Sequence, residues 1–94
     1  MNLEQYPEVN VLNVIRGFAN SSLPYKITPY RFTLSNGRKY VIEEIRQFHS
    51  EPSGKGHRFH YTVKCNDGVF YRLVFDTKTL LWRLLEGEES SNRF

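Results

Sequence analysis

The 94-residue sequence contains one cysteine, and none of its apolar runs is long enough to cross a bilayer. With Cys65 alone, no disulfide can form within the chain, so a reducing cytoplasm is the expected compartment. The amino terminus lacks the basic start and apolar stretch of a secretory signal, and we expect no membrane association. Internal repeats and low-complexity stretches are also absent. These absences exclude disulfide-stapled, membrane-spanning and repeat architectures.

What the sequence does contain predicts a single folded domain over residues 1–94. Apolar residues make up 39% of the chain and aromatic residues 15%, which is too much for an intrinsically disordered protein. One hydrophobic core usually serves about 50–200 residues, and the composition has no break that would mark a second domain. We therefore expect a domain that folds without disulfides or metal.

The net charge of +3 is unevenly distributed along the chain. The segment from Tyr25 to Arg83 holds 11 Lys and Arg against 5 Asp and Glu, whereas the two ends together hold 2 against 5. A basic middle attracts polyanions, although it lacks the long Lys/Arg clusters of a dedicated nucleic-acid domain.

The amino-terminal segment predicts a helix over residues 7–19. Pro7 suits a first helical position, and Val11 and Ile15 fall on one face at helical spacing. Because β-branched residues dominate this segment, pairing of Val9–Ile15 as a strand is the alternative.

From Tyr30 onward, apolar residues alternate with a period of two and turn signals recur at short intervals. This pattern predicts a five-stranded antiparallel meander over residues 30–85. The strands are expected at 30–34, 38–48, 57–65, 69–76 and 80–85. Packed against one helix, the meander gives an α+β fold, either a roll or a small partly closed barrel. Residues 86–94 are expected to form a disordered tail.

Side-chain faces set the expected register, because a slip of one residue would turn the apolar side chains to the wrong side. Ser35–Gly37 and Asn66–Gly68 are interpreted as three-residue loops with a left-handed glycine, since two-residue loops would set apolar residues against charged ones. The expected partners are Phe32 with Tyr40, Val63 with Tyr71, Tyr61 with Leu73, and Phe59 with Phe75.

Two further predictions concern the remaining connection and the long strand at 38–48. A four-residue loop at Asp76–Thr79 places Phe75 opposite Leu80. A change of parity along the long strand requires a bulge near Glu43–Glu44 if its isoleucines are all buried.

The face of the meander that points away from the core is the candidate interaction surface. Arg72 and Arg83 are expected directly opposite each other, an unfavourable contact of like charges that a bound anion would relieve. Apolar residues on the same face expose more area than a solvated face normally does. The predicted partner-binding residues are Phe70, Arg72, Val74, Leu81, Arg83 and Leu85. The leading hypothesis is that this face recognises a protein partner or a second copy of the chain.

The alternative function is weak binding of single-stranded nucleic acid at the same face. Basic side chains beside an exposed aromatic ring supply phosphate contact and base stacking. The candidate contacts are Lys64, Phe70, Arg72 and Arg83. An ordinary solvated face, with Glu44 offsetting the charge of Arg72, explains these residues without any ligand.

No motif predicts a cofactor, so we expect a non-enzymatic module without one. Lys55 lies between two glycines, but a phosphate-binding loop needs Ser or Thr after the lysine and a helix after the loop. The segment 49–57 is therefore expected to be a flexible hairpin loop.

The histidines and the cysteine do not predict a metal or catalytic site. His57 and His60 are three residues apart on a strand and face opposite sides, while His49 and His57 across the loop base supply only two ligands. Cys65 is expected to point inward and His60 outward, which separates the thiol from a base.

Overall fold

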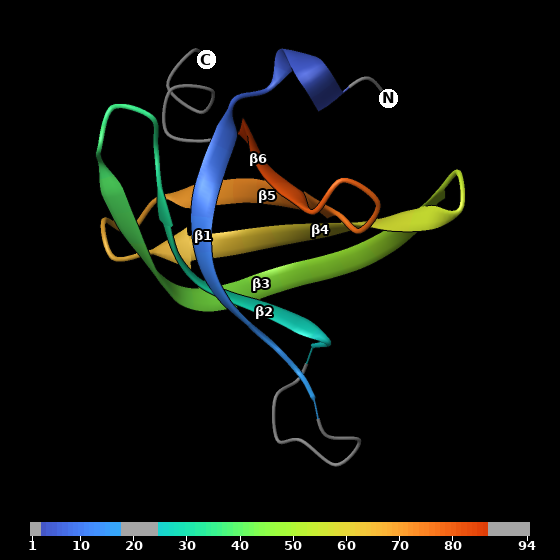
Figure 1. Ribbon diagram of the computed structural model, residues 1–94. Coiled ribbons are helices and arrows are strands. Elements are labelled where there is room, and N and C mark those ends of the chain that lie inside the picture. Colours follow the sequence, from blue (N-terminus) through green and yellow to red (C-terminus); the bar gives the residue numbers. More distant parts are fainter. Residues whose placement is uncertain (1–2, 18–24, 87–94) are drawn as a thin grey trace.

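The computed structural model describes residues 3–17 and 25–86, and most of these residues lie in strands. The elements are a short 3-10 helix, η1 (Leu3–Gln5), followed by β1 (Glu8–Ile15), β2 (Ile27–Thr33), β3 (Lys39–Ser53), β4 (Gly56–Cys65), β5 (Phe70–Asp76) and β6 (Leu81–Glu86). The six strands form a closed antiparallel barrel in chain order, with β1 pairing β6 (Figure 1). The predicted α+β fold with an amino-terminal helix is therefore wrong.

The segment predicted as a helix over residues 7–19 contains β1. Its β-branched residues favour a strand, and Val9 and Val11 alternate with outward side chains rather than forming a helical stripe. β1 pairs with β2 on one side and with β6 on the other, so the strand closes the sheet that the prediction left open. Closure removes the two exposed edges of the predicted five-stranded sheet. Residues 18–19 of the expected helix and 87–94 of the expected tail lie outside the described residues.

Two hairpin registers are as predicted. Phe32 lies opposite Tyr40 in the β2–β3 pair, and Phe59 lies opposite Phe75 in the β4–β5 pair. Gly37 and Gly68 have φ values of 89° and 80°, the left-handed conformation that these three-residue loops require.

The predicted register of the β5–β6 hairpin is wrong by two residues, because Phe75 lies opposite Trp82 and not Leu80. The Asp76 carboxylate accepts hydrogen bonds from the backbone N–H groups of Lys78 and Thr79, and Leu80 N–H donates to the Asp76 carbonyl at 2.8 Å. These bonds extend the turn through Leu80. A shift of two keeps Trp82 and Leu84 on their predicted inner face, whereas Leu80 lies in the turn and is exposed.

β3 carries the predicted bulge and a second one. Glu43 has no partner between two paired residues, as expected, and Arg46 is a second extra residue farther along the strand. Bulges bend a strand and increase its twist. β3 therefore curves around the barrel and then continues as one arm of a long β3–β4 hairpin (Figure 1).

The flexible loop expected at 49–57 is instead the end of this hairpin. β3 reaches Ser53 and β4 begins at Gly56, so only Gly54 and Lys55 form the turn. Gly54 has a φ of 60°, which suits the first central position of a type II′ turn. The tip packs against the β5–β6 turn, since the His57 N–H donates to Thr77 Oγ1 and the Thr77 N–H to the His57 carbonyl, both at 2.9 Å.

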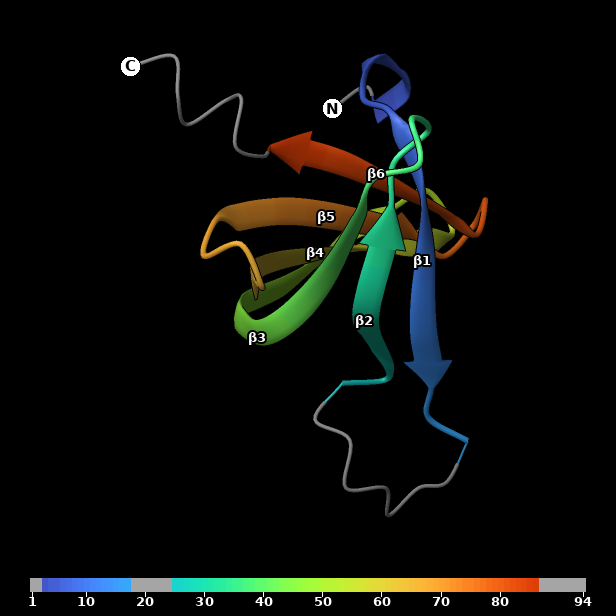
Figure 2. The same ribbon diagram turned by 90° about the vertical axis from the view of Figure 1, so that its left-hand side faces the viewer.

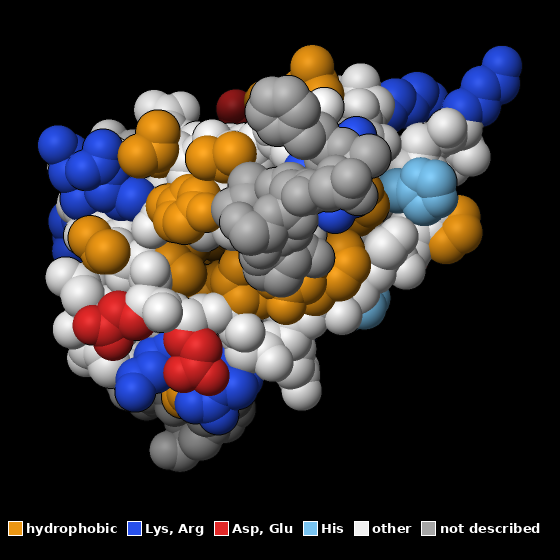
Figure 3. Space-filling model, turned by 90° about the horizontal axis from the view of Figure 1, so that it is seen from below, with side chains coloured by type: hydrophobic (Ala, Val, Ile, Leu, Met, Phe, Trp, Pro, Cys, Tyr) orange, Lys and Arg blue, Asp and Glu red, His pale blue; other side chains and the backbone are white. Residues whose placement is uncertain are grey.

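Aromatic rings fill the barrel. The Tyr61 hydroxyl donates to the carbonyl of Ile27 at 2.5 Å, and its ring contacts Trp82 and Phe48. Seen from below, hydrophobic side chains gather at the centre while most Lys and Arg side chains lie at the margins (Figure 3). No helix in the described ranges is long and apolar enough to cross a membrane.

Candidate functional site

The β4–β6 outer face is the side of these strands that points away from the barrel interior. It contains the predicted interaction surface, and its residues include Arg58, His60, Arg72, Val74, Leu81, Arg83 and Leu85. The predicted Arg72–Arg83 pair is not formed. Arg83 lies opposite Val74, and Arg72 lies opposite Glu86, because of the register of the β5–β6 hairpin.

The amino-terminal segment of the chain covers part of this face. Leu3 packs on Val74 and Leu85 in a buried cluster, with Tyr6 against its edge. Val74 is fully buried and Leu85 nearly so. Two of the six predicted partner-binding residues therefore hold η1 in place. The sequence signal for this cover is the spacing of Leu3 and Tyr6, three residues apart on one side of a helical turn.

Arg83 connects the amino-terminal segment to β6. Its Nη1 donates to the carbonyl of Tyr6 at 2.7 Å, and its Nη2 lies 3.5 Å from Oε2 of Glu8. The Leu84 N–H also donates to the carbonyl of Pro7 at 3.0 Å. Arg83 thus positions the chain between η1 and β1 and leaves only part of its guanidinium for a ligand.

The predicted nucleic-acid contacts are separated into two places. Phe70 is exposed and lies opposite Lys64, whereas Arg83 lies near η1. The structure adds Arg46, whose guanidinium carbon is 5.0 Å from the centroid of the Phe70 ring. Sequence parity could not place Arg46 because it is the extra residue of a bulge. Glu44 pairs with it at 2.7 Å, so the corner is basic but partly neutralised.

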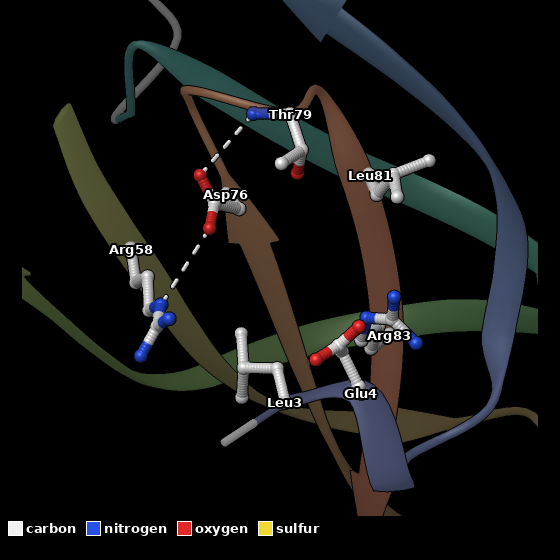
Figure 4. A pocket seen from close by; sticks show the side chains of 7 residues that line it. All are labelled: Leu3, Glu4, Arg58, Asp76, Thr79, Leu81 and Arg83. Carbon is white, nitrogen blue, oxygen red and sulfur yellow. Dashed lines mark hydrogen bonds and ion pairs between the residues drawn. The ribbon is translucent and has the colours of Figure 1, made fainter. Parts of the chain in front are cut away.

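A groove of about 680 Å³ lies between η1 and the β5–β6 turn (Figure 4). Its lining residues are Leu3, Glu4, Arg58, Asp76, Thr79, Leu81 and Arg83. Figure 4 shows Leu3 and Leu81 on opposite sides of the open centre, with Arg58 and Arg83 on the two flanks. Nε of Arg58 lies 3.6 Å from Oδ2 of Asp76, which holds one wall in place. The groove therefore combines apolar walls with fixed charges of both signs.

Leu80 stands at the end of the turn that borders this groove. It is 70% exposed and has a φ of 61°, the only positive φ of a non-glycine residue in the described part of the chain. The next residue, Leu81, lines the groove and is also exposed. Prediction by parity assigned Leu80 to a strand opposite Phe75 and so could not find this position.

His49, Glu51 and His60 form a row on the outer side of the β3–β4 hairpin. Nε2 of His60 lies 2.8 Å from Oε1 of Glu51. This hydrogen bond is the main reason that the pKa of Glu51 is lowered, with the charges of the two histidines and Arg58 adding to it against a desolvation cost. The sequence pointed to His49 with His57, whereas His49 lies opposite His60. No group of three metal-ligating side chains occurs among the residues that the structure describes.

Cys65 lies in the barrel core, away from the histidine row. Burial raises the pKa of its thiol to about 12, and nearby Asp67 and Glu43 add to the effect. The thiolate is the nucleophilic form of cysteine, so this side chain is inert at neutral pH.

The comparisons with known proteins give no family and no relative. No protein-family model matches the chain, no curated protein matches it, and no solved structure matches it.

Proposed function

We propose that the protein is a non-enzymatic module that binds a segment of a protein partner in the groove between η1 and the β5–β6 turn. The groove lies on the face that the sequence predicted as an interaction surface. Val74 and Leu85 are no longer part of the accessible area, because Leu3 of η1 covers them. Leu81 and Arg83 remain available as lining residues of the groove.

The exposed, left-handed backbone of Leu80 is the observation that carries the proposal. A non-glycine residue in a sparsely populated backbone region costs about 1–3 kcal/mol, and such residues cluster at functional sites. A glycine or asparagine would fit the same turn with less strain. Because the side chain is 70% exposed, it repays little of this cost by burial within the chain. An apolar contact between Leu80 and a partner would offset this cost.

The chemistry of the groove supports a peptide segment as the ligand. Leu3 and Leu81 offer apolar contact on two sides, and Arg58 is held in place by Asp76. Protein interfaces typically combine an apolar centre with a polar rim, and arginine is enriched in them. The best-fitting segment has an apolar side chain that enters between the leucines and a carboxylate that approaches an arginine.

The test is selection of peptides from a random display library on the wild-type protein, followed by affinity measurement on variants. We expect Leu81→Asp to weaken the selected peptides about tenfold or more, which corresponds to about 1.4 kcal/mol. Ile15→Asp is the matched control, because Ile15 is also an exposed aliphatic residue on a strand but lies outside the groove. Selection that returns only peptides insensitive to Leu81→Asp contradicts the proposal, as does a dimer in sedimentation that is lost in this variant.

Single-stranded nucleic acid is the second candidate, and the contact between Arg46 and Phe70 favours it. An aromatic ring flanked by Arg46 and Lys64 can stack on a base while the cations meet phosphates. Fluorescence anisotropy with a labelled oligothymidylate tests this candidate at several salt concentrations. Binding that weakens with salt and is lost in Phe70→Ala supports it. Absence of binding at low salt contradicts it.

A further inference from the structure

A second surface lies on the outer side of β1, β2 and β3, which stand side by side in one wall of the barrel (Figure 2). Four large apolar side chains there are between 41% and 57% exposed, namely Leu12, Val14, Tyr30 and Val41. We refer to these four residues as the β1–β3 apolar face. It shares no residue with the groove beside η1.

The strand register brings the members of this face together. Leu12 lies opposite Arg31 in the β1–β2 pair, and Arg31 lies opposite Val41 in the β2–β3 pair. These three side chains therefore form one row across three strands. Val14 follows two residues after Leu12 and points to the same side.

A bulge adds Tyr30 to the row. The pairing of β1 with β2 shifts after Leu12, and the next partner of β1 on β2 is Pro29 instead of Tyr30. Pro29 is buried while Tyr30 and Arg31 are both exposed, so the bulge turns two consecutive side chains outward. Bulges commonly re-aim a side chain, and here one directs Tyr30 to the surface.

The residues around this face are mainly basic, and Glu43, two residues after Val41 on β3, is the nearest acidic residue along the chain. Residues 10–42 contain five Lys and Arg residues and no Asp or Glu. Arg31 stands within the row, and Lys39 follows on β3 beside it. Both side chains are exposed. The face is therefore an apolar patch with the basic residues Arg31 and Lys39 beside it in the strand register.

We infer that the β1–β3 apolar face binds a protein partner that presents an apolar ridge flanked by carboxylates. Exposed contiguous apolar patches rimmed by polar residues mark interaction surfaces. Complementary charge raises the association rate and selects the partner. A second copy of this chain is disfavoured, because a symmetric contact would bring the basic rim against itself. The inference is independent of the proposed groove function.

An amphipathic helix has the right width for this face. Neighbouring strands are about 4.8 Å apart, so Leu12 and Val41 lie about 10 Å apart across β2. A helix with its side chains is about 10–12 Å wide. A helix with leucines along one face and glutamates on both flanks would place its apolar stripe on the row and a carboxylate near Arg31.

Aliphatic side chains separate this proposal from nucleic-acid binding. Base recognition by stacking needs aromatic rings or arginine planes, and only Tyr30 among the four apolar residues is aromatic. Leu12, Val14 and Val41 have no role in contact with phosphates. They bury apolar area only against another apolar surface.

The probe is a synthetic helical peptide of about five turns, with leucine at positions i, i+3, i+4 and i+7 and glutamate on the flanks. A matched peptide carries lysine in place of every glutamate. Titration is followed by fluorescence anisotropy, and the contacted residues are mapped by amide chemical shifts. We expect the glutamate peptide to bind at least about tenfold more tightly than the lysine peptide. The largest shifts are expected at Leu12, Arg31 and Val41.

Variants of the β1–β3 apolar face and of the groove test whether the peptide binds to this face. Leu12→Ser with Val41→Ser, and separately Arg31→Glu, are expected to weaken the glutamate peptide about tenfold, while Leu81→Asp in the groove leaves it unchanged. These are exposed positions, and circular dichroism and thermal unfolding verify that each variant is folded. Equal binding of both peptides, or shifts confined to the groove, would overturn the inference. So would oligonucleotide binding that competes with the peptide and persists in the Leu12/Val41 variant.

Discussion

The rings of His49 and His60 stack face to face across the β3–β4 pair, with centroids 4.4 Å apart and planes 5° from parallel. His60 is buried, and the stack encloses it from the β3 side. The Glu51 carboxylate accepts a hydrogen bond from Nε2 of His60, so the carboxylate fixes the ring that His49 covers. The stack therefore organises the base of the hairpin whose tip contacts the β5–β6 turn.

Glu51 gives this hairpin a pH-dependent contribution to stability. Because its pKa is lowered below the ordinary 4.5 by the bond to His60, the contribution is complete above about pH 4.5 and is lost as pH falls through the lowered pKa. We expect the stability difference between wild type and Glu51→Gln to shrink over that acidic range in urea unfolding. The effect is small, since the Glu51 side chain is well exposed and water screens it. A difference that stays constant from pH 7 to the acid limit argues against it.

Leu80→Gly is expected to raise stability by about 1 kcal/mol, because glycine adopts the left-handed backbone without strain. The same change removes the exposed side chain beside the groove, so peptides selected on the wild type should bind more weakly. Leu80→Ala is the control, since it shortens the side chain but keeps the β-carbon that causes the strain. Thermal and urea unfolding compare the three proteins. If alanine stabilises as much as glycine, the strain argument fails.

Local turn chemistry made the registers of the β2–β3 and β4–β5 hairpins predictable. A glycine at the end of a three-residue loop fixes which residues face each other, so Phe59 and Phe75 could be paired from sequence alone. The β5–β6 turn lacks glycine, and Leu80 takes the left-handed position instead. No sequence rule favours leucine there, and the predicted register was consequently wrong by two residues.

The amino-terminal third was not predictable for a different reason. The spacing of Val11 and Ile15 suits one face of a helix, and alternation suits a strand, so periodicity alone could not decide. What decides is closure: β1 supplies a partner for the free edges of both β2 and β6. Because a helix was predicted there, Leu12 was not placed on a sheet surface. Tyr30 was missed because of the bulge in β2. Bulges break the parity rule on which assignment of faces depends.

Gly56 is required by the contact between the hairpin tip and the β5–β6 turn. A β-carbon on Gly56 would lie 2.8 Å from Oγ1 of Thr77, which is itself held by the N–H of His57. We expect Gly56→Ala to destabilise the protein by about 1–3 kcal/mol through this overlap. Gly17→Ala is the matched control, because no atom lies within 4 Å of its added carbon. Urea unfolding measures the stability of both variants. Equal losses of stability would contradict an overlap between the added β-carbon and Thr77.

Cys65 is expected to resist thiol reagents in the folded protein. Burial raises the pKa of the thiol to about 12, with Asp67 and Glu43 adding to it, so almost no thiolate exists at pH 8. The test is the rate of reaction with a disulfide reagent, measured in buffer and in denaturing urea. Ser35→Cys supplies an exposed reference thiol on the β2–β3 loop. A native rate for Cys65 close to that of the reference would contradict its placement in the core.

Leu3→Ser should uncover the part of the β4–β6 outer face that η1 protects. Leu3 is buried against Val74 and Leu85, and loss of such an apolar contact costs about 2–4 kcal/mol in favourable cases. We expect lower stability, stronger binding of a hydrophobic dye, and concentration-dependent association, because Val74 and Leu85 become accessible. Gln5→Ser is the control in the same turn, since Gln5 is exposed. Sedimentation velocity measures the association. A Leu3→Ser variant that remains monomeric and binds no more dye than wild type would mean that η1 is not what covers this face.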